Sequence, residues 1–115
     1  MNPNKQMISY ATNYLDRFNE LFQFNEEGNL NVSLQSIQRI ETWYNDSYMM
    51  ISFVTGLPTS PLQFSFETGI EHPANQKILL HIYSVAYMAL LHFARVLKQT
   101  VPANLTPSIR EIEFA

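Results

Sequence analysis

Apolar residues recur every three or four positions along three long segments of the chain, which is the spacing of an amphipathic helix. In the first segment, residues 3–25, large apolar side chains share one side of the helical wheel and polar side chains share the other. Asn2 can cap this helix, Pro3 suits its first position, and Gly28 suits a left-handed turn after its end. The pattern therefore predicts a helix over residues 3–25.

The second segment, residues 34–55, is bounded by a helix cap and a helix stop. Ser33 precedes it as a capping residue, and Gly56 follows it. In its last two turns the polar face fades, because Met49 and Phe53 stand where polar residues had stood before. We therefore expect a helix over residues 34–55 whose carboxyl-terminal half is covered on both sides.

The third segment, residues 74–99, is the longest apolar run of the chain. At about 100° per residue it is apolar over roughly 240° of its circumference, whereas a bundle helix needs an apolar stripe of only about 100°. A narrow, mostly polar line of residues crosses it at helical spacing, with Lys98 just beside the line. We call this line and Lys98 the basic strip: Lys77, His81, Ser84, Met88, His92, Arg95, Lys98 and Gln99.

The remaining segments predict short elements. Apolar and polar residues alternate over residues 30–34 and 62–66, which favours two short strands that pair with one another. Thr106 and Pro107 have the order of a helix cap and a first helical residue, so a short last helix is expected to run to Phe114. The connection over residues 56–73 is either a lid on the core or a functional loop, and the alternating apolar residues favour the lid.

Together these elements predict one all-α domain over residues 1–115. It is a small bundle of three long helices with a short carboxyl-terminal helix and a minor two-stranded patch. The third helix is apolar around more of its circumference than the two other long helices obviously cover. Either residues 56–73 and the carboxyl-terminal tail wrap it, or another protein surface does. A homodimer built around that helix is therefore one hypothesis.

Composition narrows the classes of function. The net charge is −3 and the pI is about 5.5, which argues against a general nucleic-acid-binding protein. The absence of cysteine excludes disulfides, thiolate metal sites and a cysteine nucleophile. The first residues lack the charged-then-apolar layout of a signal peptide, so a cytoplasmic location is expected.

The apolar run also raises the question of a membrane span. Residues 78–97 are about as long as a bilayer-crossing helix requires. They contain two histidines and Arg95, however, and an arginine at mid-membrane costs about 2.5–3.5 kcal/mol on insertion scales. A buried helix of a soluble protein is the interpretation that we favour.

Catalytic and metal-binding patterns are missing from the sequence. His81 and His92 lie about 16 Å apart along a helix axis, which is too far for the pair to chelate one ion. The chain has no HExxH pattern, no Gly-x-Ser-x-Gly elbow and no glycine-rich phosphate loop. We therefore expect no enzyme activity, no cofactor, no catalytic residue and no metal ligand.

The leading hypothesis is a non-enzymatic interaction or regulatory protein, such as an adaptor, an inhibitor or an immunity-type binder. Its partner would be another protein or a second copy of the chain, and the basic strip could meet acidic residues such as Asp16, Glu20, Glu26 and Glu27 of that copy. One alternative is a small-molecule- or metal-binding bundle that uses His81, His92, Tyr83 or Tyr87, and a second is a nucleic-acid-binding regulator. The residues expected to contact a partner are Lys77, His81, His92, Arg95, Lys98, Met49 and Phe53.

Overall fold

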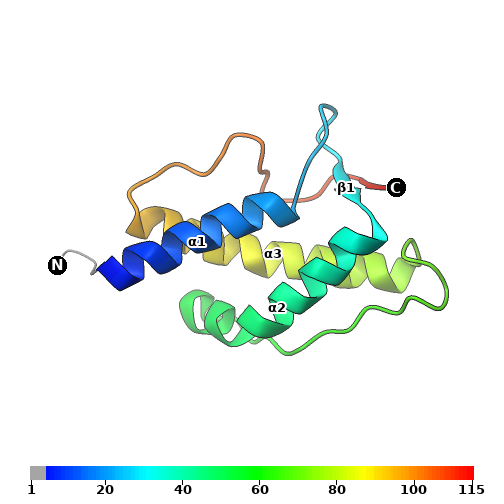
Figure 1. The fold of residues 1–115 in the computed structure, drawn as a ribbon, viewed down its shortest axis with the longest axis horizontal. Helices are drawn as coiled ribbons and strands as arrows, with labels where there is room; N and C mark the ends of the chain where they lie inside the picture. Colours follow the sequence, from blue (N-terminus) through cyan, green and yellow to red (C-terminus); the bar gives the residue numbers. More distant parts are fainter. Residues whose placement is uncertain (1–4) are drawn as a thin grey trace.

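A computed structural model describes residues 5–115, which form three helices and two short strands (Figure 1). The predominantly helical fold that the sequence predicts is confirmed. The proposed cap at Asn2 and Pro3 lies outside the described residues. The elements are α1 Lys5–Leu21, β1 Leu30–Val32, α2 Leu34–Thr55, α3 Pro73–Val96 and β2 Ile112–Phe114.

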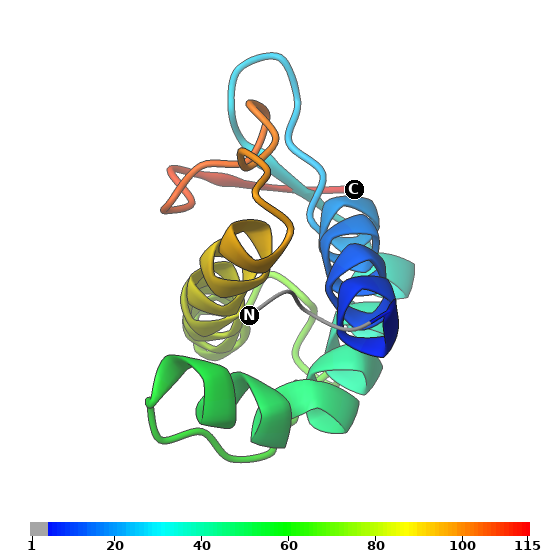
Figure 2. The same cartoon turned by 90° about the vertical axis from the view of Figure 1, so that its left-hand side faces the viewer.

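Both α1 and α2 pack on α3, which lies at the back of the molecule in Figure 1. An aromatic cluster joins the three helices: the ring of Phe18 contacts the rings of Tyr83 and Trp43. Figure 2 shows that the carboxyl-terminal half of α2 lies away from α1, so the two helices diverge.

The predicted bounds of α2 are confirmed because both of its ends carry local capping bonds. Ser33 and Ser36 form a reciprocal capping box at the amino end. Gly56 has φ 73° at the carboxyl end, and its main-chain N–H donates to the carbonyl of Ser52. α3 begins at Pro73, one residue before the predicted range of 74–99, and the imidazole of His72 accepts a hydrogen bond from the N–H of Ala74.

The predicted extension of the first helix to residue 25 is wrong, because α1 ends at Leu21. The chain turns into a tight hairpin instead, in which Phe24 and Leu30 form an antiparallel bridge. The side-chain carbonyl of Asn25 accepts the N–H groups of Glu27 and Asn29, and such local bonds compete with a helical backbone. Gly28 does adopt a positive φ, but within this hairpin turn.

The predicted short carboxyl-terminal helix is also wrong. Residues 112–114 form β2, which pairs in parallel with β1 so that Leu30 lies opposite Ile112 and Val32 opposite Phe114. Both strands point alternate side chains into the core, and this period of two cannot be met by a helix. The carboxylate of Glu113 accepts bonds from the side-chain amides of Asn25 and Asn29, which ties β2 to the hairpin.

The predicted pairing of residues 30–34 with 62–66 is therefore wrong as well. Residues 57–66, which we call the strap, run extended along α2 without a partner strand. Side chains of α2 make the hydrogen bonds to the strap that a partner strand would make. The amide of Asn45 bonds both main-chain groups of Leu62, at 2.8 and 2.9 Å, and the carboxylate of Glu41 accepts the N–H of Phe64 at 2.7 Å.

The strap covers the core, in agreement with the lid interpretation. Phe64 is buried, and Leu57 and Leu62 pack partly buried against the same cluster. After the strap the chain turns at Gly69 and enters α3. Apolar residues of the strap thus alternate with exposed ones, as in a strand, although the strap itself belongs to no sheet.

The third helix is shorter than the predicted range of 74–99, because α3 ends at Val96. Lys98 has φ 53°, its N–H donates to the carbonyl of Arg95, and the N–H of Gln99 donates to that of Ala94. This pair of bonds is a Schellman ending, which satisfies the last carbonyls of the helix and reverses the chain.

Candidate functional site

The basic strip lies on the outer face of α3. The side chains of Lys77, His81 and Arg95 are exposed, while His92 is half-buried with its ring edge-on to Phe93. Leu80 and Met88 are exposed by 42% and 45% among these polar groups. The strip is therefore a mixed basic and apolar surface, with its charges spread along the whole helix.

The rest of α3 is covered within the chain. Its opposite side, including Leu79, Ile82 and Leu90, is fully buried by the two other helices, the strap and the segment that follows α3. The sequence leaves two covers open for this girth, wrapping by residues 56–73 and the tail or a second protein surface, and the structure shows the first. The strap and residues 97–109 both pack on the core, which weakens the argument for a dimer around α3.

Lys98 differs from the other residues of the strip. It lies beyond the end of α3 at a positive φ, where its backbone forms the helix ending. Its side chain is exposed. The backbone of Lys98 therefore has a structural role in ending α3, whether or not its side chain contacts a partner.

Met49 and Phe53 are exposed by 71% and 89%, so the expectation that this half of α2 is covered on both sides is wrong. At about 100° per residue, both lie on the side of α2 opposite the buried Tyr44 and Ile51. The strap covers a neighbouring side of the helix and leaves this one to solvent. Phe53 is the most exposed of the large apolar residues described.

The structure does not bring the two predicted groups into one site. Within residues 5–115, no hydrogen bond, ion pair, ring contact or described hollow joins the basic strip to Met49 or Phe53. They lie on the outer sides of two different helices. Each group is therefore a separate candidate surface.

A groove between α1 and α2 was missed by the sequence analysis. A hollow of about 410 Å³ lies beside Trp43, and it is walled by Arg17 of α1 and by Arg39 and Asp46 of α2. A second hollow of about 350 Å³ continues past the amino end of α2 to Val32 and Ser33. The two hollows share Leu21, Gln35 and Arg39, so they form one groove.

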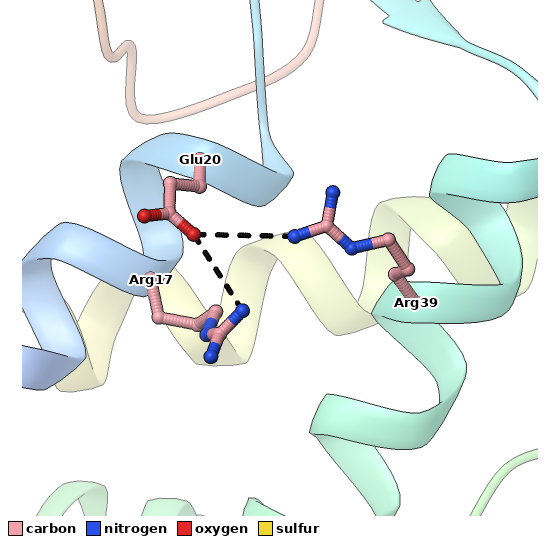
Figure 3. A network of polar contacts seen from close by, with 3 residues as sticks. All are labelled: Arg17, Glu20 and Arg39. Atoms are coloured by element: carbon pink, nitrogen blue, oxygen red, sulfur yellow. Dashed lines mark ion pairs between the residues drawn. The ribbon is translucent and has the colours of Figure 1, made fainter.

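The charges of this groove come from both walls. The carboxylate of Glu20 lies 3.5 Å from the guanidinium of Arg17 and 3.9 Å from that of Arg39 (Figure 3). All three side chains are about half exposed, so each contact contributes only about 0.2–1 kcal/mol to stability. Both guanidinium groups can therefore turn toward another carboxylate at small cost.

Two tyrosines in the core, Tyr14 and Tyr83, have raised pKa values. Burial raises the pKa of Tyr14 well above its ordinary value and raises that of Tyr83 to about 12. The hydroxyl of Tyr14 donates to the carbonyl of Ala86, and that of Tyr83 donates to the carbonyl of Thr106. Tyrosine is neutral at physiological pH with or without such a shift, so these two residues serve packing and hydrogen bonding in the core.

The histidines and the tyrosines named for a ligand-binding bundle lie on opposite sides of α3. Tyr83 is buried and hydrogen-bonded, whereas His81 is exposed on the other side of α3. Over the described part of the chain, no group of three histidine, aspartate or glutamate residues is placed to hold a metal ion. None of the hollows described along residues 5–115 is lined by His81, His92, Tyr83 or Tyr87.

α3 is the one described helix that is long and apolar enough to cross a membrane, with a mean hydropathy of 1.4 over its most apolar window. Half of that window is buried inside the molecule. The core helix of a soluble protein has the same length and composition, so these properties alone are weak evidence for a membrane span.

No family model, curated protein or solved structure matches this chain. The candidate surfaces therefore stand on the sequence and the geometry of the molecule itself.

Proposed function

We propose that this chain is a non-enzymatic interaction protein, in the class of adaptors, inhibitors and immunity-type binders. In this proposal the three helices act as one small bundle that presents α2 to a partner. The observation that carries it is the exposure of Phe53 by 89% and of Met49 by 71%, one helical turn apart. Fully burying a side chain of this size stabilises a complex by about 1.5–3 kcal/mol, so the pair is suited to anchor one.

The basic strip supports a second contact on the same partner or on another one. Lys77, His81 and Arg95 are exposed on α3 beside the apolar side chain of Met88. An acidic, partly apolar protein segment complements such a surface. A nucleic acid complements it less well, because the chain as a whole carries a net charge of −3.

Site-specific photo-crosslinking in cells tests the proposal. A benzophenone amino acid at position 53 is expected to capture another protein, because a partner anchored by Phe53 must lie within its reach. The same group at the exposed Glu26, in the hairpin turn, is the matched control and is expected to capture nothing specific. Absence of a specific adduct from positions 53, 88 and 95 alike would contradict the proposal.

A small-molecule ligand is the second candidate, and the groove between α1 and α2 favours it. Its main hollow of about 410 Å³ falls within the size range of ligand pockets, about 300–1,000 Å³. Trp43, the only tryptophan, lines that hollow. A ligand screen read by tryptophan fluorescence therefore tests this candidate directly, and Trp43→Phe provides the blank.

A further inference from the structure

The outer side of α2 carries two lines of residues at heptad spacing. Arg39, Asp46 and Phe53 form one line, and they are separated by seven residues each time. The second line runs beside it, and all six residues are exposed. Because seven residues make almost two helical turns, each line follows one face of the helix. We call the six residues the outer ridge: Gln35, Arg39, Thr42, Asp46, Met49 and Phe53.

The two ends of the ridge have opposite shapes. Its carboxyl-terminal end carries the protruding Phe53 and Met49. Its amino-terminal end borders the hollow of about 350 Å³ that Val32, Ser33 and Gln35 help to line. One helix thus holds a protrusion at one end and a recess at the other.

We propose that a second copy of this chain packs antiparallel along the outer ridge, related to the first by a two-fold axis. In this dimer Arg39 of each copy pairs with Asp46 of the other copy, and Phe53 of each copy enters the recess beside Val32 of the other. The inference rests on the proposed function, in which this face of α2 binds a protein. It adds that the partner is the chain itself.

A single register satisfies both contacts. In an antiparallel pair that sets residue 39 against residue 46, each step toward the carboxyl end of one helix is a step toward the amino end of the other. Phe53 lies seven residues beyond Asp46, and Val32 lies seven residues before Arg39. The first spacing is about 10.5 Å along the helix axis at 1.5 Å per residue, whereas α2 of the other copy begins at Leu34, only about 7.5 Å before Arg39. When the charges meet, Phe53 therefore reaches past the amino end of that helix, where Val32 and Ser33 help to line the recess.

The charge order favours a second copy over an unrelated protein. A two-fold axis forms the Arg39–Asp46 pair twice, because each copy contributes the same surface patch to the interface. Closed dimers are built in this way. The contact of Arg39 with Glu20 at 3.9 Å is loose, so the guanidinium is available for a closer carboxylate. The net charge of −3 on each copy opposes association only weakly, because the Debye length is about 8 Å at physiological salt.

Sedimentation velocity and light scattering on the full chain test this dimer. The wild type is expected to show a monomer–dimer equilibrium between about 10 and 200 µM. Phe53→Asp is expected to weaken dimerisation at least about tenfold, because a charge then replaces the buried ring. Phe66→Asp, at an exposed aromatic position that belongs to no proposed contact surface, is the matched control and should leave the equilibrium unchanged.

A charge exchange tests the register. Arg39→Asp gives a ridge with two acids, and Asp46→Arg gives a ridge with two arginines, so each variant alone should be monomeric. An equimolar mixture of the two should form heterodimers, and the double variant Arg39→Asp/Asp46→Arg should regain the homodimer. Far-ultraviolet circular dichroism checks that every variant keeps its helices, which is expected because both positions are exposed.

A wild type that stays monomeric at about 200 µM would overturn the dimer. A dimer that survives Phe53→Asp, or one that is lost in Phe66→Asp instead, would overturn this interface. The proposed function is judged separately by the crosslinking. A monomeric wild type whose position 53 captures a different protein overturns the dimer and leaves that function standing, whereas a monomer without any specific adduct overturns both.

Discussion

The side-chain amide of Asn75 bonds both main-chain polar groups of Ser65. Its oxygen accepts the N–H at 2.9 Å and its nitrogen donates to the carbonyl at 2.6 Å. Asn75 is 1% exposed and belongs to the first turns of α3. A helix side chain thus makes the bonds that a neighbouring strand would make, and it fastens the end of the strap to α3.

Replacing Asn75 by alanine is expected to lower the free energy of unfolding by about 1–3 kcal/mol, because these bonds are lost from a buried site. Urea unfolding followed by circular dichroism measures the change. Asn104→Ala is the control, since the Asn104 amide is exposed and bonds only the exposed side chain of Asn19. That control should cost less than about 0.5 kcal/mol, and equal losses in the two variants would contradict the role of Asn75.

Tyr14 and Tyr44 make a matched pair for a second prediction. Both are buried, but the hydroxyl of Tyr14 donates to the carbonyl of Ala86 at 2.8 Å, whereas that of Tyr44 has no partner among residues 5–115. Tyr14→Phe should therefore cost about 1 kcal/mol, and Tyr44→Phe should be neutral or stabilising by a similar amount. Thermal unfolding of both variants decides, and a larger loss in Tyr44→Phe than in Tyr14→Phe would refute the assignment.

Replacing Lys98 by glycine is expected to stabilise the chain. Its φ of 53° lies in the left-handed region, which costs a residue with a Cβ about 1–2 kcal/mol and costs glycine almost nothing. After the entropy that glycine loses on folding, Lys98→Gly should stabilise the chain by about 0.5–1 kcal/mol. Lys77→Gly, inside α3, should instead destabilise it by about 1 kcal/mol, so a fall in melting temperature for both variants would argue against the helix ending described here.

The buried tyrosines predict a loss of stability in alkali. Burial raises the pKa of Tyr83 to about 12, from about 10 in an unfolded chain. Because the folded value is the higher one, the stabilisation is complete below pH 10 and is lost as the pH rises through 12. Urea unfolding at pH 8, 10 and 11 should show the decline begin at about pH 10.

Tyr83→Phe is the control for that decline. It should lower the stability at pH 8 by about 1 kcal/mol, because the bond to the carbonyl of Thr106 is lost. Its stability should then fall less steeply between pH 10 and 11 than that of the wild type. An alkaline slope equal to that of the wild type would show that Tyr83 does not contribute to it.

Local signals in the sequence determined the parts of the fold that depend on neighbouring residues. Ser33 and Gly56 predicted both ends of α2, because capping bonds join residues only a few positions apart. The mostly helical fold and the polar line along α3 followed from the 3.6-residue period for the same reason.

Tertiary structure alone decided which residues far apart in the sequence contact one another. Leu30 pairs with Ile112, and no periodicity within a short segment can indicate a contact between residues so far apart. The sequence predicts that residues 62–66 pair with another strand, but the side chains of Asn45 and Asn75 bond their main chain instead. The exposure of Phe53 also depends on where the strap lies, which the apolar pattern of α2 could not show. Periodicity tells which side chains share a face, whereas only packing between segments decides whether that face is covered.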